Sequence, residues 1–363
     1  MKAAEIENDP RENYKVLPGG ATLVSVVIVC YNSRRWLPKC FDSLQKQTFF
    51  HQSEVILVDN ASKDGTELLA RELTAGWSNA CVVQTGDNVG FGAANNCGVK
   101  VSQGRYVYFL NPDTWLEADC LEQFFTVAER DNAGCASGLI LEYEDDTEQA
   151  RGSVGFDFCG YPVAPHGSHV PEQVCCVNGF FFIRKDLYAR LGGFDEKLFM
   201  YGEEMDLSWR IWISGEKIVP ALAARVHHRG AASVNPEGGV KIVENRTSTQ
   251  KRFLANRNGL LFVAKNCEHL LLLMLLPCAA LIVMEGLFVL LMTRNAAIAK
   301  KISLDVFADF WRLRGHVFQE RKRIRSFRRH GDFWMLRFFR LGFGRGHEIR
   351  AILKRGFPKF NRS

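Results

Sequence analysis

One stretch constrains the fold of this chain most strongly: residues 105–113, which read RYVYFLNPD. Residues 106–110 are a short apolar run, mostly aromatic or β-branched, and such a run predicts a strand buried in a parallel sheet. Pro112 has no N–H for the hydrogen-bond ladder, so the strand must end there. Asp113 is therefore expected at the carboxyl end of a strand, the edge where open α/β sheets bind ligands. An ordinary turn, with Asp113 capping a helix that starts near Trp115, is the alternative.

Two β-branched runs precede this strand, residues 23–30 and 54–59, and each is followed by a helical pattern. The first run should form a central strand, with Ser33 capping a helix that continues to residue 47. A strand, a helix and a second strand make a βαβ unit with a right-handed crossover. The order of elements therefore predicts an α/β fold with a mostly parallel central sheet.

A turn rich in glycine and asparagine follows a short third strand at residues 81–84 and reads TGDNVGFGAANNCGVKV. Such a turn lets the backbone approach a ligand closely and supplies amide donors at the start of a helix. It matches neither GxGxxG nor GxxxxGK[ST], which argues against a dinucleotide fingerprint and a P-loop. Small residues packed tightly on the sheet are the alternative interpretation.

The segment after Asp113 is expected to complete the sheet. Residues 142–173 are polar and interrupted by Gly and Pro, which is typical of an irregular loop or hairpin that carries specificity contacts. The other expected elements are a helix at 116–130, strands at 134–141 and 174–183, a short helix at 185–191, and two short strands at 217–220 and 223–228.

Glu203, Glu204 and Asp206 crowd the first turn of a helix that Gly215 should end. Carboxylates in a first turn interact favourably with the helix dipole, so a structural role is one interpretation. Three acids this close also repel one another unless a cation or an acceptor hydroxyl uses them. The histidine pair at residues 227–228 ends the last strand and is equally consistent with a ligand role and with none.

Six stretches together resemble the family 2 glycosyltransferases with the GT-A fold, in the bacterial branch that includes rhamnosyl and galactofuranosyl transferases. They are VSVVIVCYNS, VDNASKDGT, DNVGFGAANNCGV, YFLNPD, VNGFFFIRKDLYARLGGFDEKLFMYGEEMDLSWR and VHHRGAAS. They occur in the family's order between residues 23 and 233. Each stretch alone is a weak signal, whereas six in register are highly specific.

The resemblance implies a nucleotide-sugar donor at the carboxyl ends of the first four strands, with Asp113 holding a divalent cation on the diphosphate. His228 resembles the family histidine that can complete this metal site. Among the other residues, Asp59 would contact the base with Asn32 and Asp64 nearby, Asn88, Gly90 and Asn96 would line the ribose and diphosphate, and Asn111 belongs to the same donor site.

The chemistry of such a transfer explains these residue types. A diphosphate leaving group gains negative charge, which Mg²⁺ or Mn²⁺ on a carboxylate can neutralise. The acceptor hydroxyl must lose a proton to a general base, and the resemblance assigns this role to Glu204. Two departures from the family matter: NPD replaces the DxD motif, and the base is Glu rather than Asp. Whether Glu203 or Glu204 is the base is therefore open, with Asp206 fixing the helix start or an acceptor group.

The charge is unevenly distributed. Residues 312–363 contain 16 Lys and Arg against 3 Asp and Glu, whereas the whole chain carries +6, so the first 311 residues are net acidic. A basic tail interleaved with aromatics suits anionic lipid headgroups or RNA. The neighbouring apolar segment favours the membrane, and no nucleic-acid fold signature is present.

The N-terminus has no signal-like apolar run, and the 11 cysteines show no paired spacing, which favours a reduced cytosolic setting.

Residues 270–292 are apolar except for Glu285, and 23 residues are long enough to cross a bilayer. Pro277 interrupts the run, a carboxylate at mid-membrane is costly, and one crossing would export the basic tail. A broken, membrane-embedded or interfacial helical hairpin is favoured, with a true span and a buried or oligomer-interface helix as alternatives.

These observations predict three regions: a polar tail at 1–20, a catalytic domain at 21–262 and a helical membrane-associating region at 263–363. The expected function is inverting, metal-dependent transfer of rhamnose or a related hexose from a dTDP- or UDP-sugar to a lipid-linked or polysaccharide acceptor in envelope glycan synthesis. The expected location is the cytoplasmic face of the bacterial inner membrane, with contact through 270–355. A catalytically silent nucleotide-sugar-binding scaffold is the alternative, and self-association is left open.

Overall fold

The computed structural model describes residues 22–165, 172–230, 246–341, 356 and 359–361. The chain forms two compact units. The sheet unit comprises Met1–Gly152, Pro171–Phe199 and Lys217–Gly230, and the helical unit comprises Ser153–Val170, Met200–Glu216 and Ala231–Ser363. The units interleave along the chain, so the domain boundary near residue 262 remains a prediction. The N-terminal tail at 1–20 and most of residues 342–363 lie outside the described residues.

The sheet unit contains the predicted mostly parallel sheet, in the order β3-β2-β1-β4-β10-β6-β11-β5, with β7 beside β6. β1 to β4 pair in parallel, and β10 is antiparallel to both β4 and β6, so β6 and β11 run in the same direction as β4. The strands are β1 Val24–Cys30, β2 Ser53–Asp59, β3 Ala80–Gln84, β4 Tyr106–Leu110, β5 Thr114–Leu116, β6 Cys135–Glu142, β7 Glu148–Ala150, β10 Phe181–Arg184 and β11 Ile218–His228.

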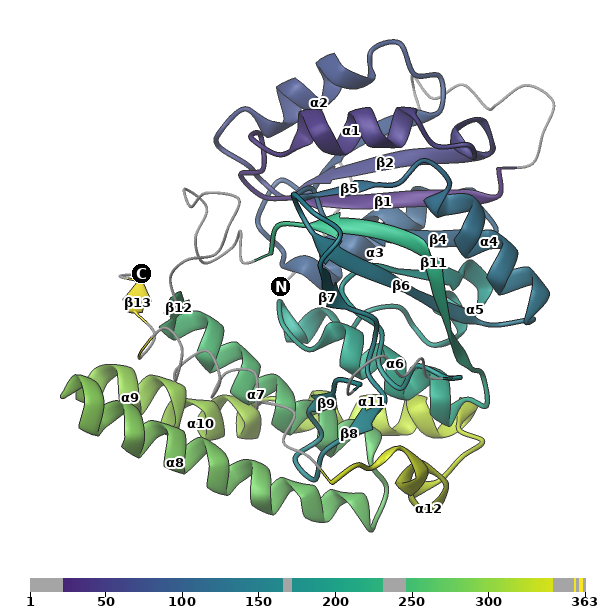
Figure 1. Cartoon of the computed structure of the whole chain (residues 1–363). Coiled ribbons are helices and arrows are strands. Elements are labelled where there is room, and N and C mark those ends of the chain that lie inside the picture. The colour runs from purple at the N-terminus through teal and green to yellow at the C-terminus, as the bar shows by residue number, and fades with distance from the viewer. Residues whose placement is uncertain (1–21, 166–171, 231–245, 342–355, 357–358, 362–363) are drawn as a thin grey trace. The chain divides into compact units, whose positions relative to one another are not determined.

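Helices cover both faces of this sheet, because alternate strand residues point to opposite sides. Helices α1, α2 and α4 share one core cluster with the even-numbered residues of β1 and β4, and Figure 1 shows α1 and α2 side by side on that face. Gly98 of α3 lies against Val27 and Val58 on the other face. The helices are α1 Leu37–Gln45, α2 Thr66–Thr74, α3 Phe91–Val101, α4 Cys120–Arg130 and α5 Lys185–Arg190.

Several local expectations were wrong. Ser33 does not cap α1, because its hydroxyl accepts from the Tyr31 N–H and the helix begins only at Leu37, with a proline in its first turn. The helix expected at 116–130 begins only at Cys120, because residues 114–116, including Trp115, form β5 and pair with β11. The strand expected at 174–183 is limited to β10, and the two short strands at 217–228 are one strand with an irregularity after Ala221.

The helical unit is built around α7, which contacts α6, α8, α9, α10 and α11. Most of α7 is buried, including the polar residues Asn256, Asn258 and Lys265. The helices are α6 Glu203–Ile213, α7 Thr249–Asn266, α8 Leu275–Thr293, α9 Ala296–Ile302, α10 Leu304–Arg312, α11 Arg314–Phe327 and α12 Asp332–Met335. Two short strand pairs complete it, β8 Gly155–Phe156 with β9 Pro162–Val163 and β12 Arg246–Ser248 with β13 Lys359–Asn361.

Helix α8 contains the long apolar run. Pro277 lies in its first turn, where a missing N–H costs little, so the helix is continuous to Thr293. Glu285 pairs with Arg252 at 3.5 Å and accepts from Asn256, so the carboxylate faces α7. The opposite side of α8 exposes only apolar side chains, among them Leu276, Val283, Met284, Leu287, Phe288, Leu291 and Met292.

Candidate functional site

Six strands of the sheet unit, β1, β2, β3, β4, β6 and β11, run in the same direction, so their carboxyl ends share one edge. This edge holds Asn32 after β1, Asp59 at the end of β2, Asp113 after β4 and His228 at the end of β11. The placement of Asp113 inferred from RYVYFLNPD alone is therefore what the sheet shows. We call this group of side chains the edge site.

Asp113 and His228 come together in the edge site, although they are 115 positions apart in the sequence. His228 Nε2 lies 3.5 Å from Asp113 Oδ2, and the carboxylate is nearly buried while the imidazole is partly exposed. The Arg229 N–H donates to the Asp113 carbonyl, which ties the two strand ends together. A carboxylate oxygen and an imidazole nitrogen at this separation are a ligand pair suited to a divalent transition metal.

Asp59 is a buried carboxylate with one oxygen free of protein partners. Its Oδ2 accepts from the Ser62 N–H at 3.3 Å, whereas Oδ1 is buried and has no hydrogen-bond partner in the described residues. Burial raises the pKa of Asp59 above its ordinary value. A buried acceptor without a partner costs free energy, so this oxygen is well suited to accept from a bound ligand.

Asn32 and Asp64 connect the loops that follow β1 and β2. Asn32 has a left-handed backbone with φ of 52°, and its Oδ1 accepts from the Lys63 N–H at 2.8 Å. Asp64 accepts from the Arg34 N–H and from the Thr66 N–H and hydroxyl. Both side chains therefore hold the loops beside Asp59 in place, and in a donor site they would act mainly by shaping it.

The glycine- and asparagine-rich turn leads into α3 as expected. Asn88 Oδ1 accepts from the Asn60 side chain at 3.0 Å and from the Gly90 N–H at 3.1 Å. Gly90 has φ of 90°, and a Cβ there would collide with the Phe199 carbonyl. This turn therefore needs glycine for both its conformation and its close packing.

Asn96 and Asn111 make structural contacts. The Asn96 side chain accepts from the Tyr188 hydroxyl and the Phe194 N–H, and it donates to the Phe194 carbonyl and to Glu196. It thus fixes the segment after α5. The Asn111 carbonyl accepts from the Thr114 hydroxyl at 2.6 Å, which closes the turn between β4 and β5.

The acidic turn at the start of α6 lies in the helical unit, and its three carboxylates have different surroundings. Asp206 is fully buried, accepting from Arg210 at 2.7 Å and from Asn266 at 2.6 Å and pairing with Lys265 at 3.0 Å. All these partners are themselves buried. Asp206 is therefore the centre of a structural ion-pair network.

Glu203 and Glu204 differ from Asp206 and from each other. Glu203 is buried, and its Oε1 has no hydrogen-bond partner in the part of the chain that the structure describes. Glu204 is partly exposed. Burial raises the pKa of both carboxyls, and repulsion from Glu204 raises that of Glu203 further. Of these two glutamates, Glu204 is the one that is partly exposed to solvent.

The backbone before these acids is held in an unusual conformation. Tyr201 has φ of 74° and Gly202, the N-cap of α6, has φ of 94°. The buried Asn258 amide donates to the Met200 carbonyl at 2.9 Å and to the Tyr201 carbonyl at 2.7 Å. A non-glycine residue at positive φ persists only when its surroundings enforce it, and Asn258 supplies that restraint.

The comparison with known families identifies the domain. The family model described as glycosyl transferase family 2 matches residues 25–192. This region is a family 2 glycosyltransferase domain. It contains β1 to β4 and every edge-site residue except His228, which follows it in the chain.

Relatives of this glycosyltransferase domain agree on the family. The chain is 35% identical to glycosyltransferase AglE of Haloferax volcanii over 51% of this chain and 59% of that one. It is 24% identical to rhamnosyltransferase WbbL of Escherichia coli K12 over 65% of this chain and 96% of that one. Across the first three curated relatives, the chain covers 35%, 19% and 59% of their own lengths.

A solved structure shows the GT-A fold of the glycosyltransferase. The mannosyltransferase PcManGT from Pyrobaculum calidifontis, in complex with GDP-Man and Mn²⁺, superposes with a TM-score of 0.51 at 15% identity. The match covers 79% of this chain and 87% of that one. The expected fold class is thereby confirmed.

A second cluster of ionisable groups lies beside the edge site in the sheet unit. Glu117, Asp146 and His227 place their ligand atoms within 4.8 Å of one another. The Arg225 guanidinium lies 3.1 Å from Glu117 and 3.6 Å from Asp146, and His227 stacks on Trp115. The Arg225 guanidinium offsets one of the two negative charges and already pairs with both acids, which favours an ion-pair network over a metal site.

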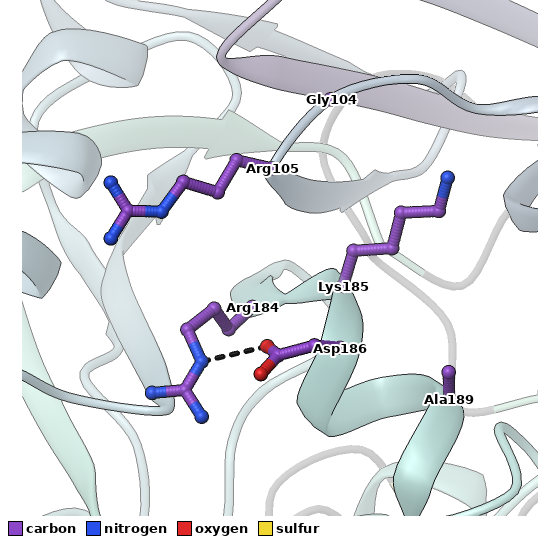
Figure 2. A pocket seen from close by; sticks show the side chains of 6 residues that line it. All are labelled: Gly104, Arg105, Arg184, Lys185, Asp186 and Ala189. Carbon is purple, nitrogen blue, oxygen red and sulfur yellow. Dashed lines mark hydrogen bonds and ion pairs between the residues drawn. The ribbon is translucent and has the colours of Figure 1, made fainter.

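Figure 2 shows an open cavity of about 550 Å³ at the opposite edge of the sheet. It is lined by residues at the amino end of β4 and the carboxyl end of the antiparallel β10, including Arg105 and Arg184. These cations are paired, Arg105 with Glu129 at 2.9 Å and Arg184 with Asp186 at 2.7 Å. The cavity lies at the other end of the strands from the edge site, and both of these arginines already have an acidic partner.

Sequence reasoning missed three residues that shape these groups: Gln149, Arg229 and Asn258. Gln149 contacts His228 from β7, in a stretch that reads as polar loop. Arg229 is buried beside Asp113 within the HHRGAAS stretch. Asn258 lies 54 positions after Glu204, and only its burial in α7 reveals it. Of the three, only Arg229 had a usable signal, its position next to the histidine pair.

Proposed function

We propose that this protein is an inverting, metal-dependent glycosyltransferase. It moves a sugar from a nucleotide-diphosphate donor to a lipid-linked or polysaccharide acceptor in cell-envelope glycan synthesis. The observation that carries the proposal is the meeting of Asp113 and His228 at the carboxyl edge of the sheet, in the same edge site as the free oxygen of Asp59. The family and the fold support it.

The divalent cation fits the residues present. Asp113 offers a carboxylate oxygen and His228 an imidazole nitrogen that faces it, a mixed donor set that favours Mn²⁺ over an all-oxygen Mg²⁺ site. The bound cation would supply charge neutralisation for the diphosphate leaving group. The fold relative solved with Mn²⁺ supports this choice. The buried Arg229 beside Asp113 would add a second positive charge for the phosphates.

Asp59 would select the donor by accepting a base N–H at its buried Oδ1. The loops held by Asn32 and Asp64 and the turn held by Asn88 and Gly90 would surround the nucleotide, while Asn96 and Asn111 fix neighbouring segments. Rhamnose from a dTDP donor is the first candidate, supported by the relative named a rhamnosyltransferase, with UDP-hexoses second.

The general base is proposed to be Glu204, because it is reachable from solvent whereas Glu203 is buried. A pKa raised by burial makes a carboxylate a stronger base near neutral pH. Asp113 and Glu204 belong to separate units, so their approach across one cleft remains a prediction. Asp206 would keep the start of α6 in place without contacting substrate.

A donor panel tests this function. The purified full chain is mixed with dTDP-rhamnose, UDP-hexoses and GDP-mannose, with Mn²⁺ or with EDTA, and donor binding is measured by thermal shift, which mass action makes sensitive to a bound ligand. Transfer or hydrolysis is measured in parallel. We expect one donor to bind only with the metal and to be turned over, and Asp113→Ala to lose both. Binding without turnover in any condition would instead support a silent scaffold.

We further propose that α8 attaches the protein to the cytoplasmic face of a bacterial inner membrane. Among the described residues, Leu271–Thr293 is the one helix long and apolar enough to cross a membrane, and only 28% of its apolar window is buried. Its exposed side carries no charge, and the basic C-terminal residues complement anionic lipid. Flotation with vesicles of phosphatidylglycerol should capture the protein, and a double Leu287→Glu, Leu291→Glu variant should not float. Unchanged flotation of that variant would exclude α8 as the contact.

A further inference from the structure

Gln149 makes two hydrogen bonds to the same residue of the edge site. It lies in β7, the short strand beside β6. Its Nε2 donates to the His228 backbone carbonyl at 3.3 Å, and its Oε1 lies 2.7 Å from His228 Nδ1. The amide thus spans the backbone and the ring of one histidine.

These two contacts determine which ring nitrogen of His228 carries the proton in the neutral imidazole. A backbone carbonyl can only accept, so the NH₂ group of Gln149 must face it and the amide oxygen must face Nδ1. The amide oxygen in turn can only accept, so Nδ1 must carry the hydrogen. Nε2 then keeps its lone pair, and this lone pair faces Asp113 Oδ2 at 3.5 Å.

The ring orientation is fixed from a second direction. Phe180 is buried and packs edge to face against the His228 ring, with centroids 4.7 Å apart. In the neutral imidazole, Asp113 Oδ2 and His228 Nε2 are therefore two acceptor atoms held facing each other. Such an arrangement is unfavourable alone and becomes favourable around a cation.

His227 shows that this arrangement is specific to His228. The His227 ring also has Nδ1 next to an acceptor, the Glu142 carbonyl at 2.9 Å. Its Nε2, however, faces Glu117, and the Arg225 guanidinium lies on the same carboxylate. The Arg225 guanidinium therefore already pairs with the carboxylate oxygen that His227 faces.

We propose that Gln149 is a positioning residue that prepares His228 Nε2 to bind the divalent cation. It acts through the histidine and touches neither metal nor substrate. The inference rests on the proposed function, because it assumes that Asp113 and His228 hold the metal. A partner that fixes the tautomer and orientation of a metal-bound histidine typically changes metal affinity by about 10- to 100-fold.

The test compares Gln149→Met, which removes both hydrogen bonds at similar size, with Gln149→Glu, which keeps an acceptor for Nδ1. Gln123→Met is the matched control, since Gln123 is a partly buried glutamine of α4 that bonds only within its own helix, to Asp119. Mn²⁺ affinity is measured without donor by calorimetry or by the loss of the free-ion EPR signal. The His228 tautomer is read from ¹⁵N imidazole shifts of metal-free protein, assigned by comparison with His228→Ala.

We expect Gln149→Met to weaken Mn²⁺ binding by about 10- to 100-fold and to lose the pure Nδ1–H tautomer. Gln149→Glu should stay within about threefold of wild type, and Gln123→Met should be unchanged. If Asp113→Ala abolishes Mn²⁺ binding while Gln149→Met binds normally with an unaltered tautomer, the role of Gln149 is refuted and the metal site stands. If wild type binds no Mn²⁺, or Asp113→Ala binds as wild type does, the metal site itself is refuted, and the role of Gln149 with it.

Discussion

The edge site of the sheet unit and the acidic turn of α6 both concentrate carboxylates, yet their surroundings differ. In the edge site, Asp59 has a buried oxygen without a partner, and Asp113 faces the acceptor side of His228. In α6, Asp206 has buried cationic or amide partners on both oxygens. A carboxylate whose oxygens are filled by the protein, such as Asp206, serves the fold, whereas the unfilled buried oxygen of Asp59 can accept from a ligand. Sequence spacing alone does not separate the two kinds.

The largest effect is expected from the two neighbouring glutamates of α6, to which their different exposure assigns different roles. Glu204→Gln should lower turnover by about 10²- to 10⁴-fold, the usual contribution of a general base, with little change in donor affinity. Glu203→Gln is the matched variant and should retain at least a tenth of wild-type turnover. The measurement is single-turnover transfer with saturating donor and metal. The reverse result would make Glu203 the base.

Asp206 should contribute to stability instead. Asp206→Asn would leave Lys265 and Arg210 buried without their carboxylate, and breaking a buried pair in this way typically costs about 3–5 kcal/mol. Urea denaturation of the full chain measures this loss. Asp305→Asn, which removes an exposed pair with Lys300, should cost much less, because solvent screens an exposed pair. Equal losses of stability in both variants would show that the buried ion pairs of Asp206 stabilise the fold no more than an exposed pair does.

Asp59 of the edge site and Asp64 of the neighbouring loop show the same contrast: one has a buried oxygen without a partner, and the other has oxygens already occupied by the protein. Asp59→Asn should weaken nucleotide binding by about 10- to 100-fold, because a hydrogen bond to a charged acceptor is worth about 1.5–3 kcal/mol. Asp64 already accepts from Arg34 and Thr66, so Asp64→Asn should mainly lower the melting temperature. Calorimetry with the free nucleoside diphosphate distinguishes the Asp59→Asn variant from the Asp64→Asn variant. If Asp64→Asn weakened nucleotide binding more than Asp59→Asn does, the assignment of Asp59 as the nucleotide-binding carboxylate would be wrong.

The fold was largely predictable because its signals are local. The β-branched runs of β1 and β2 and the aromatic run of β4 mark buried strands, and Pro112 marks where the last of them ends. The errors arose where tertiary pairing decided: Trp115 lies in a strand only because β11 lies beside it. The site was less predictable, since the filled oxygens of Asp206 depend on Lys265 and Asn266, about 60 residues further along the chain.

The smallest effect concerns the stability of Glu203→Gln as a function of pH. Burial and repulsion from Glu204 raise the folded-state pKa of Glu203 above its ordinary value of 4.5, so the folded protein binds this proton more tightly than the unfolded chain does. The wild type therefore loses stability as pH rises from about 4.5 through the raised pKa. Glutamine resembles the protonated acid and avoids this loss, so the variant should gain about 1 kcal/mol at pH 8, the ordinary size of a single-residue effect. The gain should disappear near pH 4, where the wild-type carboxyl is protonated in both states. Urea titrations at the two pH values measure it, and a gain that is equal at both would show that Glu203 is not a buried, unpaired carboxyl.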